Sequence, residues 1–526
     1  MVGVAGRSKG CNTCRKRRVK CDEAKPECYR CIKAGFECLG YQRATQWRHT
    51  SLAPVPASRL HISELVDVVQ PMPVSFVPPR ELSLGAFERD MCTTHMFGNF
   101  VWRSYGALWL NQASEGKLGN LSLDAVTALS QLSFGLNNSV RELQLKGAAQ
   151  YGRCLRILAE ELRRESATGY DNRRLVVPIL VLMMVSAIQT DRTAAVFHLK
   201  AIEKVLMLCG PSAFQQQPLR NAFEASRATL LIPSLFSRRR IFLEDPCWQD
   251  VPYALDPYAK PQQSRLLDIL VTIPGLLEEN ARIESIGNPT GDGPSPNLDK
   301  RLRYQESLCE RIIVQLERLF RWRWDWQREF GQCISEDNCK RQPRTFSLDD
   351  SNPIDCPKEF SRLQFDRFAH ANDIMLYNSA LIWQMTLLWK LKPSQARFMI
   401  QGCARHAATS AAMSPRSSMA SHSVSFAPLA QPGAALSIRD PAIEVCRIFD
   451  WQCRYREHCG ALDDQACLYL FPLGMARSIL GTEPRYQKWI DDMLDSSPVT
   501  AGYGRHGGSV VDFGSYITSR ALYPDI

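Results

Sequence analysis

The sequence predicts a mainly α-helical protein in three parts: a small cysteine-rich domain at residues 1–41, a proline-rich linker at 42–81 and a large all-α domain at 82–526. Three observations predict this fold class. Six cysteines stand at regular spacing near the N-terminus, prolines cluster after them, and apolar residues then recur at helical spacing. A chain of 526 residues with 45% apolar residues is long enough for several domains, one of them with a large core.

The first element is a repeat of cysteines separated by 2, 6, 6, 2 and 6 residues. Each half offers a Cys-x-x-Cys pair and a third cysteine, and the second half follows the first by 17 residues. We expect each pair to lie at the start of a helix, which gives this domain two short helices. The spacing is typical of metal ligands. The candidate ligands are Cys11, Cys14, Cys21, Cys28, Cys31 and Cys38.

Counting these ligands indicates two zinc ions. Structural zinc takes four ligands in a tetrahedron, so two ions need eight bonds and two of the six sulfurs must bridge. Symmetry alone allows any equivalent pair of cysteines to be the bridge. The alternatives are a disulfide knot and a single zinc site with spare thiols. Disulfide frameworks belong to secreted chains, and residues 1–10 have no apolar signal core.

The two halves of the repeat differ in charge. The first carries five cations between its second and third cysteines, whereas the second carries only Lys33, balanced by Glu37. Helical residues turn by about 100° each, so the five cations cannot share one face, and we expect some to reach bases and others to contact the backbone of double-stranded DNA. A nuclear import signal or a solvated run of charge is the alternative. The five residues are Arg15, Lys16, Arg17, Arg18 and Lys20.

These residues carry a resemblance to the fungal six-cysteine binuclear zinc cluster, a DNA-binding module of transcription regulators. The resemblance implies that Cys11 and Cys28 bridge the two ions, that Cys14 and Cys21 complete one zinc, and that Cys31 and Cys38 complete the other. It also implies a turn between the halves, with Pro26 as a candidate cis peptide.

The resemblance further implies how the cations would be used on DNA. The position of Arg18, with help from that of Arg17, reads a CGG-type triplet in the family, and the positions of Arg15 and Lys20 lie near phosphates. Many members carry lysine at the reading positions. The arginine fork pairs with guanine O6 and N7, so a G-rich triplet is expected here as well.

Charge, hydropathy and cysteine usage favour a soluble, intracellular protein, and the resemblance implies the nucleus as its location. Residues 1–50 hold 12 Lys or Arg and 4 Asp or Glu, which is +8 of the net +10. The positive charge is thus concentrated in one small domain, which is expected to bind the polyanion, DNA. Thirteen further cysteines are scattered, as in a reducing compartment. The most apolar stretch, residues 175–188, is too short to span a membrane and is predicted to be a core helix.

Residues 82–526 show helical stripes, such as one through Leu308, Ile312, Leu316 and Leu319 and another through Leu143, Ala148, Tyr151, Leu155, Leu158 and Leu162. The alternating Trp322, Trp324 and Trp326 suit a strand or a base-stacking platform, but their helical context favours wedges between helices. Residues 238–240 are three arginines followed by Glu244 and Asp245, which indicates a locally neutralised helix end.

The segments at residues 198–214 and 228–254 resemble the middle region of fungal zinc-cluster regulators. The resemblance implies that residues 82–526 form the helical regulatory domain of such a protein, with transcription machinery or co-regulators as partners. Two irregular stretches, near residues 286–300 and 407–438, are expected to be disordered insertions.

An enzyme domain fused to the zinc module is the alternative function. Gly502, Gly504 and Gly507 match G-x-G-x-x-G, but no buried strand precedes them, and the G-x-S-x-G around Ser8 stands in a basic tail with no room for a strand. We therefore expect no catalytic residues. The expected function is a sequence-specific regulator of RNA polymerase II transcription, acting on metabolic or biosynthetic cluster genes.

The linker offers little for dimerisation. Many relatives carry a coiled coil after the cluster, which needs three or four heptads of apolar residues. Here residues 58–70, enclosed by Pro56 and Pro71, supply at most two. Residues 1–80 are expected to be monomeric, and any homodimer would form through the helical domain.

Overall fold

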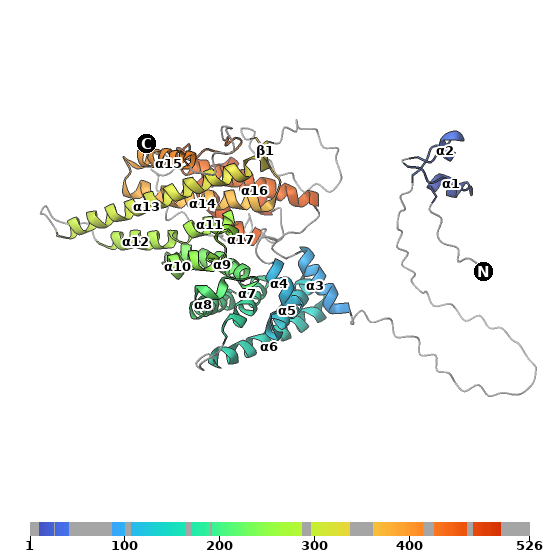
Figure 1. Cartoon of the computed structure of the whole chain (residues 1–526), viewed down its shortest axis with the longest axis horizontal. Coiled ribbons are helices and arrows are strands. Elements are labelled where there is room, and N and C mark those ends of the chain that lie inside the picture. The colour runs from blue at the N-terminus through green and yellow to red at the C-terminus, as the bar shows by residue number, and fades with distance from the viewer. Residues whose placement is uncertain are drawn as a thin grey trace, which may run out of the picture. The chain divides into compact units, whose positions relative to one another are not determined.

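The computed structural model describes residues 10–25, 27–40, 87–99, 107–164, 171–189, 192–286, 296–336, 361–413, 425–459 and 466–495. The chain divides into two compact units, Met1–Arg80 and Glu81–Ile526 (Figure 1). Several predictions fall outside the described residues: the linker at 42–81, the turn residue Pro26, the motif around Ser8 and the glycine motif at 502–507.

The first unit contains two five-residue helices, α1 (Asn12–Lys16) and α2 (Tyr29–Lys33), as the cysteine repeat predicts. The second is built almost entirely of helices, which confirms the mainly α fold class. Its first helices are α3 (Glu88–Asn99), α4 (Ala107–Ser114), α5 (Asn120–Asn137), α6 (Arg141–Arg164), α7 (Arg173–Ile188), α8 (Arg192–Cys209), α9 (Leu219–Ser237) and α10 (Pro246–Asp250). There follow α11 (Gln262–Leu270), α12 (Ile273–Ser285), α13 (Pro296–Phe330), α14 (Phe368–Leu391), α15 (Ala396–Ala412), α16 (Arg439–Cys459), α17 (Ala466–Leu480) and α18 (Pro484–Asp495).

Short pieces connect these helices. Single 3-10 turns are η2 (Pro211–Phe214), η3 (Phe242–Glu244), η4 (Val251–Tyr253), η5 (Pro257–Ala259) and η6 (Gly331–Cys333). The strands of the described part are β1 (Ile334–Glu336) and β2 (Leu363–Phe365), paired antiparallel with Ile334 opposite Phe365. Beside them, Asp366 Oδ1 lies 2.7 Å from His370 Nδ1, a hydrogen bond that joins the end of β2 to the first turn of α14.

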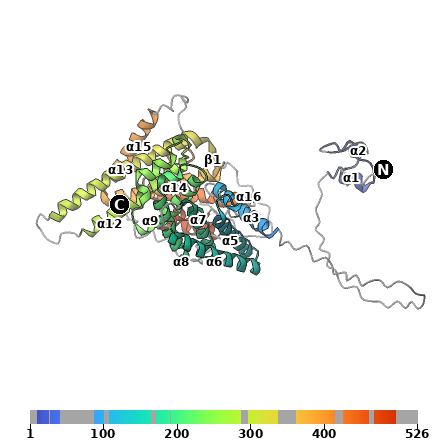
Figure 2. The same ribbon diagram turned by 60° about the horizontal axis from the view of Figure 1, so that its bottom comes forward.

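The core is organised around α14. Its residues from His370 to Trp389 are buried on every side, and it contacts α11, α12, α13, α15, α16 and α17. Figure 1 shows α14 among these helices, and in both views it lies beside α13 (Figures 1 and 2). An apolar sequence without a polar face is what a helix packed on all sides requires. Among the described residues, no helix is long and apolar enough to cross a membrane.

The predicted stripes are largely confirmed. Leu308, Ile312, Leu316 and Leu319 on α13 are all buried. Trp322 and Trp326 are buried in the same helix, and their indole N–H groups donate to the Gln262 carbonyl at 2.8 Å and to Asp373 Oδ2 at 3.0 Å. The tryptophans are therefore wedges between helices, not a stacking platform.

The stripe expected on α6 is confirmed except at one position. Leu143 and Leu158 are buried, and Tyr151, Leu155 and Leu162 are partly buried against the core. Ala148 is exposed, and the buried line runs through Gly147 instead. A Cβ on Gly147 would lie 2.7 Å from Leu132 Cγ on α5, and one on Gly135 of α5 would lie 2.8 Å from the Gln144 nitrogen. The two helices approach so closely that only glycine fits at these positions, and the hydrophobic pattern does not record that requirement.

The two expected disordered insertions need correction. Helix α13 already begins at Pro296, and α15 includes residues 407–412, with Ala407 and Ala411 buried. Farther on, Phe426, Leu429 and Ile438 are also buried. The small alanines let α15 pack against α13, and the Phe426 ring meets Trp324 edge-on at a centroid distance of 4.6 Å. Residues 287–295 and 414–424 lie outside the described part.

The run of arginines after α9 is neutralised locally, as expected. Arg238 caps α9 in the left-handed conformation, with φ of 55°. Arg240 forms ion pairs with Glu244, at 2.8 Å, and with Glu279 of α12. This cation therefore joins two helices.

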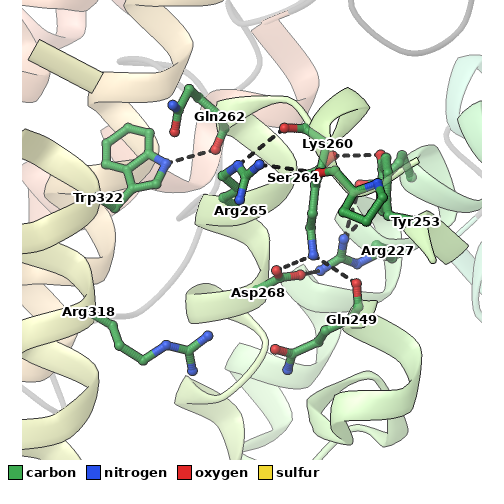
Figure 3. Close-up of polar contacts among 12 residues, drawn as sticks. Arg227, Gln249, Tyr253, Lys260, Gln262, Ser264, Arg265, Asp268, Arg318 and Trp322 are labelled. Carbon is green, nitrogen blue, oxygen red and sulfur yellow. Dashed lines mark hydrogen bonds and ion pairs between the residues drawn. The ribbon is translucent and has the colours of Figure 1, made fainter. Parts of the chain in front are cut away.

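A charged network is buried between α9 and α11 (Figure 3). The side chain of Arg227 is 1% exposed, and its guanidinium donates to Glu224 at 3.0 Å and to Asp268. Lys260 pairs with the other oxygen of Asp268, and the Tyr253 hydroxyl donates to Glu224 at 3.3 Å. Two cations thus balance two carboxylates inside the fold.

Candidate zinc cluster and nucleic-acid interface

The two Cys-x-x-Cys pairs open the two short helices in the same way. Cys11 caps α1, and its Sγ accepts a hydrogen bond from the Cys14 N–H at 3.3 Å. Cys28 caps α2, and its Sγ accepts from the Cys31 N–H at 3.3 Å. The sulfur takes the place that a serine or aspartate oxygen usually fills at a helix start, so each cap also fixes the direction of a candidate ligand.

The two helices also end alike. In α1 the Val19 N–H donates to the Cys14 carbonyl and the Arg18 N–H to the Arg15 carbonyl; in α2 the Phe36 and Gly35 N–H groups do the same one repeat later. This Schellman pattern needs a left-handed residue after the helix. The second helix has glycine there, Gly35 with φ of 68°, but the first has Arg18 with φ of 55°.

The six sulfurs gather in one place. Two groups of four have their ligand atoms within 4.8 Å of one another: Cys11, Cys14, Cys21 and Cys28, and Cys11, Cys28, Cys31 and Cys38. Both groups contain Cys11 and Cys28, whose sulfurs lie 3.6 Å apart. Cys11, Cys14, Cys28 and Cys31 are fully buried, while Cys21 and Cys38 are half-buried.

This donor set fits two metal ions. Six sulfurs satisfy two tetrahedra only if two are shared, and the two overlapping groups have that composition. Burial raises the pKa of the thiols of Cys11, Cys14, Cys28 and Cys31. Buried thiolates therefore need a cation beside them, and zinc supplies it. Backbone N–H groups of Cys28 and Gly40 lower the pKa of Cys38.

Hydrogen bonds tie the two halves together. Thr13 Oγ1 donates to the Glu37 carbonyl and accepts from the Leu39 N–H, both at 2.9 Å, and the Asn12 N–H donates to the Gly40 carbonyl at 2.9 Å. The role of Thr13 has no signal in the cysteine spacing. The backbone of residues 37–40 therefore helps to hold the two halves together, in addition to the sulfurs.

All five cations of the first half are exposed: Arg15, Lys16, Arg17, Arg18 and Lys20. Within the described part of the chain, none of them forms an ion pair with a carboxylate. Arg17 has a different neighbour, because its guanidinium carbon lies 3.8 Å from the centroid of the Phe36 ring. The positive charge of these five residues is therefore available to an external anion.

Comparison with known proteins decides what this cysteine arrangement is. Residues 9–48 match the Fungal Zn(2)-Cys(6) binuclear cluster domain. Residues 9–48 are a zinc-cluster domain of this fungal type. Its cofactor is therefore two zinc ions, as the ligand count predicts. The zinc cluster occupies a small part of the chain.

Relatives of this zinc cluster are fungal regulators. A transcriptional regulatory protein of Schizosaccharomyces pombe is 45% identical over 62 residues, which is 12% of this chain and 11% of the relative. The aspercryptin biosynthesis cluster-specific transcription regulator of Emericella nidulans is 48% identical over 63 residues, 12% of this chain and 10% of the relative. The white-opaque regulator 2 of Candida albicans is 64% identical over 33 residues, 6% of this chain and 7% of the relative.

These matches span about a tenth or less of the relatives' length. No solved structure matches the chain. The comparisons therefore assign no role to most of the helical unit.

Proposed function

We propose that this protein is a sequence-specific DNA-binding transcription regulator that acts in the nucleus and reads a G-rich, CGG-like triplet in the major groove. One observation carries the proposal: five exposed cations without carboxylate partners among the described residues stand at the end of α1, beside a zinc cluster of the fungal type. DNA phosphates offer the anionic surface that such a face requires.

The proposed ligand assignment follows the two overlapping sulfur groups. Cys11 and Cys28, which belong to both groups, would be shared by the two zinc ions; Cys14 and Cys21 would complete the ligands of one ion, and Cys31 and Cys38 those of the other. When bound, zinc stabilises the thiolates and rigidifies the short helices. The chain itself then directs the residues that follow α1 toward the nucleic acid.

The five cations divide into reading and positioning groups. Arg18 and Arg17 are assigned to guanine edges, because the arginine fork can donate two hydrogen bonds to O6 and N7. Arg15 and Lys20 are assigned to phosphates, and Lys16 is a further DNA-binding residue. The left-handed backbone of Arg18 supports its role, because the equivalent position of the second half has glycine, which takes that conformation without strain.

The helical unit is assigned to regulation. It would receive signals from co-regulators or the transcription machinery and provide any homodimer contact. The resemblance of the zinc cluster to a biosynthesis cluster-specific regulator supports target genes of the metabolic or biosynthetic kind. The chain would act by binding DNA and not as an enzyme.

The test is a selection of duplexes from a random pool by the full-length, zinc-loaded protein. We expect enrichment of a G-rich triplet, loss of binding with a strong chelator, and two zinc ions per chain by elemental analysis. A Cys11→Ser or Cys28→Ser variant should lose both ions, because each sulfur is assigned to both tetrahedra. A protein that binds all duplexes alike, or holds one zinc, contradicts the proposal.

A further inference from the structure

We propose that Phe36 is a positioning residue for Arg17 and thereby a determinant of DNA specificity, an inference that rests on the proposed function. The two residues come from opposite halves of the zinc cluster. The Arg17 guanidinium carbon lies 3.8 Å from the centroid of the Phe36 ring, which is the distance of a stacked contact. Arg17 and Phe36 are both exposed, and the phenylalanine is 50% exposed.

The internal repeat indicates that the zinc cluster does not need an aromatic ring at residue 36 for its backbone. One repeat earlier stands Val19, whose N–H donates to the Cys14 carbonyl as the Phe36 N–H donates to the Cys31 carbonyl. Valine thus fills the same backbone position after α1 that phenylalanine fills after α2. A half-exposed ring also contributes little to the sulfur core. The ring is therefore free to serve the neighbouring arginine.

The repeat also shows that the arginine is present in the first half only. The residue that corresponds to Arg17 in the second half is Ala34, and both are the C-caps of their helices. The cation and the ring are therefore each present in one half only. Their contact joins the two halves of the repeat and couples the second half to the segment that carries the cations.

Stacking prepares the guanidinium for recognition. The ring covers one flat face of the group, while its N–H donors lie in the plane of the guanidinium and remain available at its edge. An arginine already held in this way loses less side-chain freedom when it binds. Lysine has a compact ammonium group in place of the flat fork, so the contact suits arginine.

The experiment measures affinity for the selected duplex, for single base-pair variants of it and for a random duplex, using full-length protein with its zinc content verified. Phe36→Ala should weaken the selected duplex about two- to fivefold, the range of an exposed cation–π contact. It should lower discrimination at the base pair that Arg17 reads and leave the random duplex unchanged. Phe36→Tyr, which keeps the ring, should behave like the wild type.

Two further variants separate positioning from packing. Phe36→Leu keeps an apolar side chain of similar size and should retain both zinc ions, yet lose discrimination as Phe36→Ala does. In an Arg17→Lys background, Phe36→Leu should have little additional effect. Equal weakening on all duplexes, or an undiminished effect of Phe36→Leu in that background, overturns the inference while the proposed function stands. A wild-type protein without sequence preference overturns the proposed function itself, and with it this inference.

Discussion

Replacing Arg18 by glycine should separate the stability of the zinc cluster from its reading of DNA. Arg18 has φ of 55°, a left-handed conformation that costs an L-residue about 1 to 2 kcal/mol. The same hydrogen-bond pattern after α2 is built on Gly35, with φ of 68°, so glycine fits this backbone. Arg18→Ala retains the strain, whereas Arg18→Gly removes it.

We therefore expect Arg18→Gly to be more resistant to unfolding than Arg18→Ala by about 1 kcal/mol. Both variants should lose binding to the selected duplex by about 1 to 3 kcal/mol, because both lack the fork that pairs with guanine. Stability is measured as the chelator concentration that removes half of the zinc, and binding as the dissociation constant at fixed salt.

Gly35→Ala is the matched control, because it introduces a side chain at the position of the second half that corresponds to Arg18. An added Cβ at Gly35 meets nothing within 4 Å, so only the positive φ opposes the substitution. This variant should lose about 1 kcal/mol of stability and keep its DNA specificity. If Arg18→Gly releases zinc more readily than Arg18→Ala, the strain argument is wrong. If Arg18→Gly still discriminates between triplets, Arg18 does not read bases.

Three further predictions concern phosphates, buried charge and pH. If Arg15 and Lys20 contact phosphates, Arg15→Ala and Lys20→Ala should each weaken binding to all duplexes alike. Each should also reduce the slope of log affinity against log salt concentration by about one. A change in sequence preference would contradict the assignment to phosphates. Arg227→Ala should cost about 3 to 5 kcal/mol of stability, because the buried carboxylate of Glu224 loses its cation while Asp268 keeps only Lys260. The exposed Arg239→Ala should cost less than about 0.5 kcal/mol in the same thermal melts, and equal costs would refute the reasoning. Burial raises the pKa of Asp373 to about 7. Between about pH 4 and 7 the folded state therefore holds a proton that the unfolded state has released. The free energy of unfolding should fall as the pH rises through this range. Asp373→Asn should flatten that fall and stabilise the protein at pH 8, since the amide oxygen can still accept from Trp326; a lower melting temperature at pH 8 would contradict it.

Much of the zinc cluster could be predicted because its information is local. The 17-residue offset places each Cys-x-x-Cys at a helix start, and the short reach from Cys11 to Cys38 leaves the six sulfurs few ways to meet. The same locality made the α13 stripe predictable, since each turn of that helix presents an apolar residue to one side.

The features that escaped prediction depend on contacts between distant residues. Gly147, and not Ala148, lies in the buried line of α6 because Leu132 of α5 leaves no room there for a side chain. Phe426 is buried because Trp324, about a hundred residues earlier, offers an edge-on partner. The stack of Arg17 on Phe36 joins the two halves of the cluster. Spacing within one segment cannot reveal such partners.

The burial of α14 has a consequence for synthesis on the ribosome. Three of its neighbours, α15, α16 and α17, lie after it in the chain, so the apolar surface of α14 stays uncovered until they emerge. A nascent chain that stops after Leu391 presents this surface to chaperones and to other nascent chains. The sulfur groups, in contrast, lie within residues 11–38 and leave the exit tunnel long before. A premature stop codon in the second half of the gene is thus expected to yield a complete zinc cluster attached to an unfinished, aggregation-prone core.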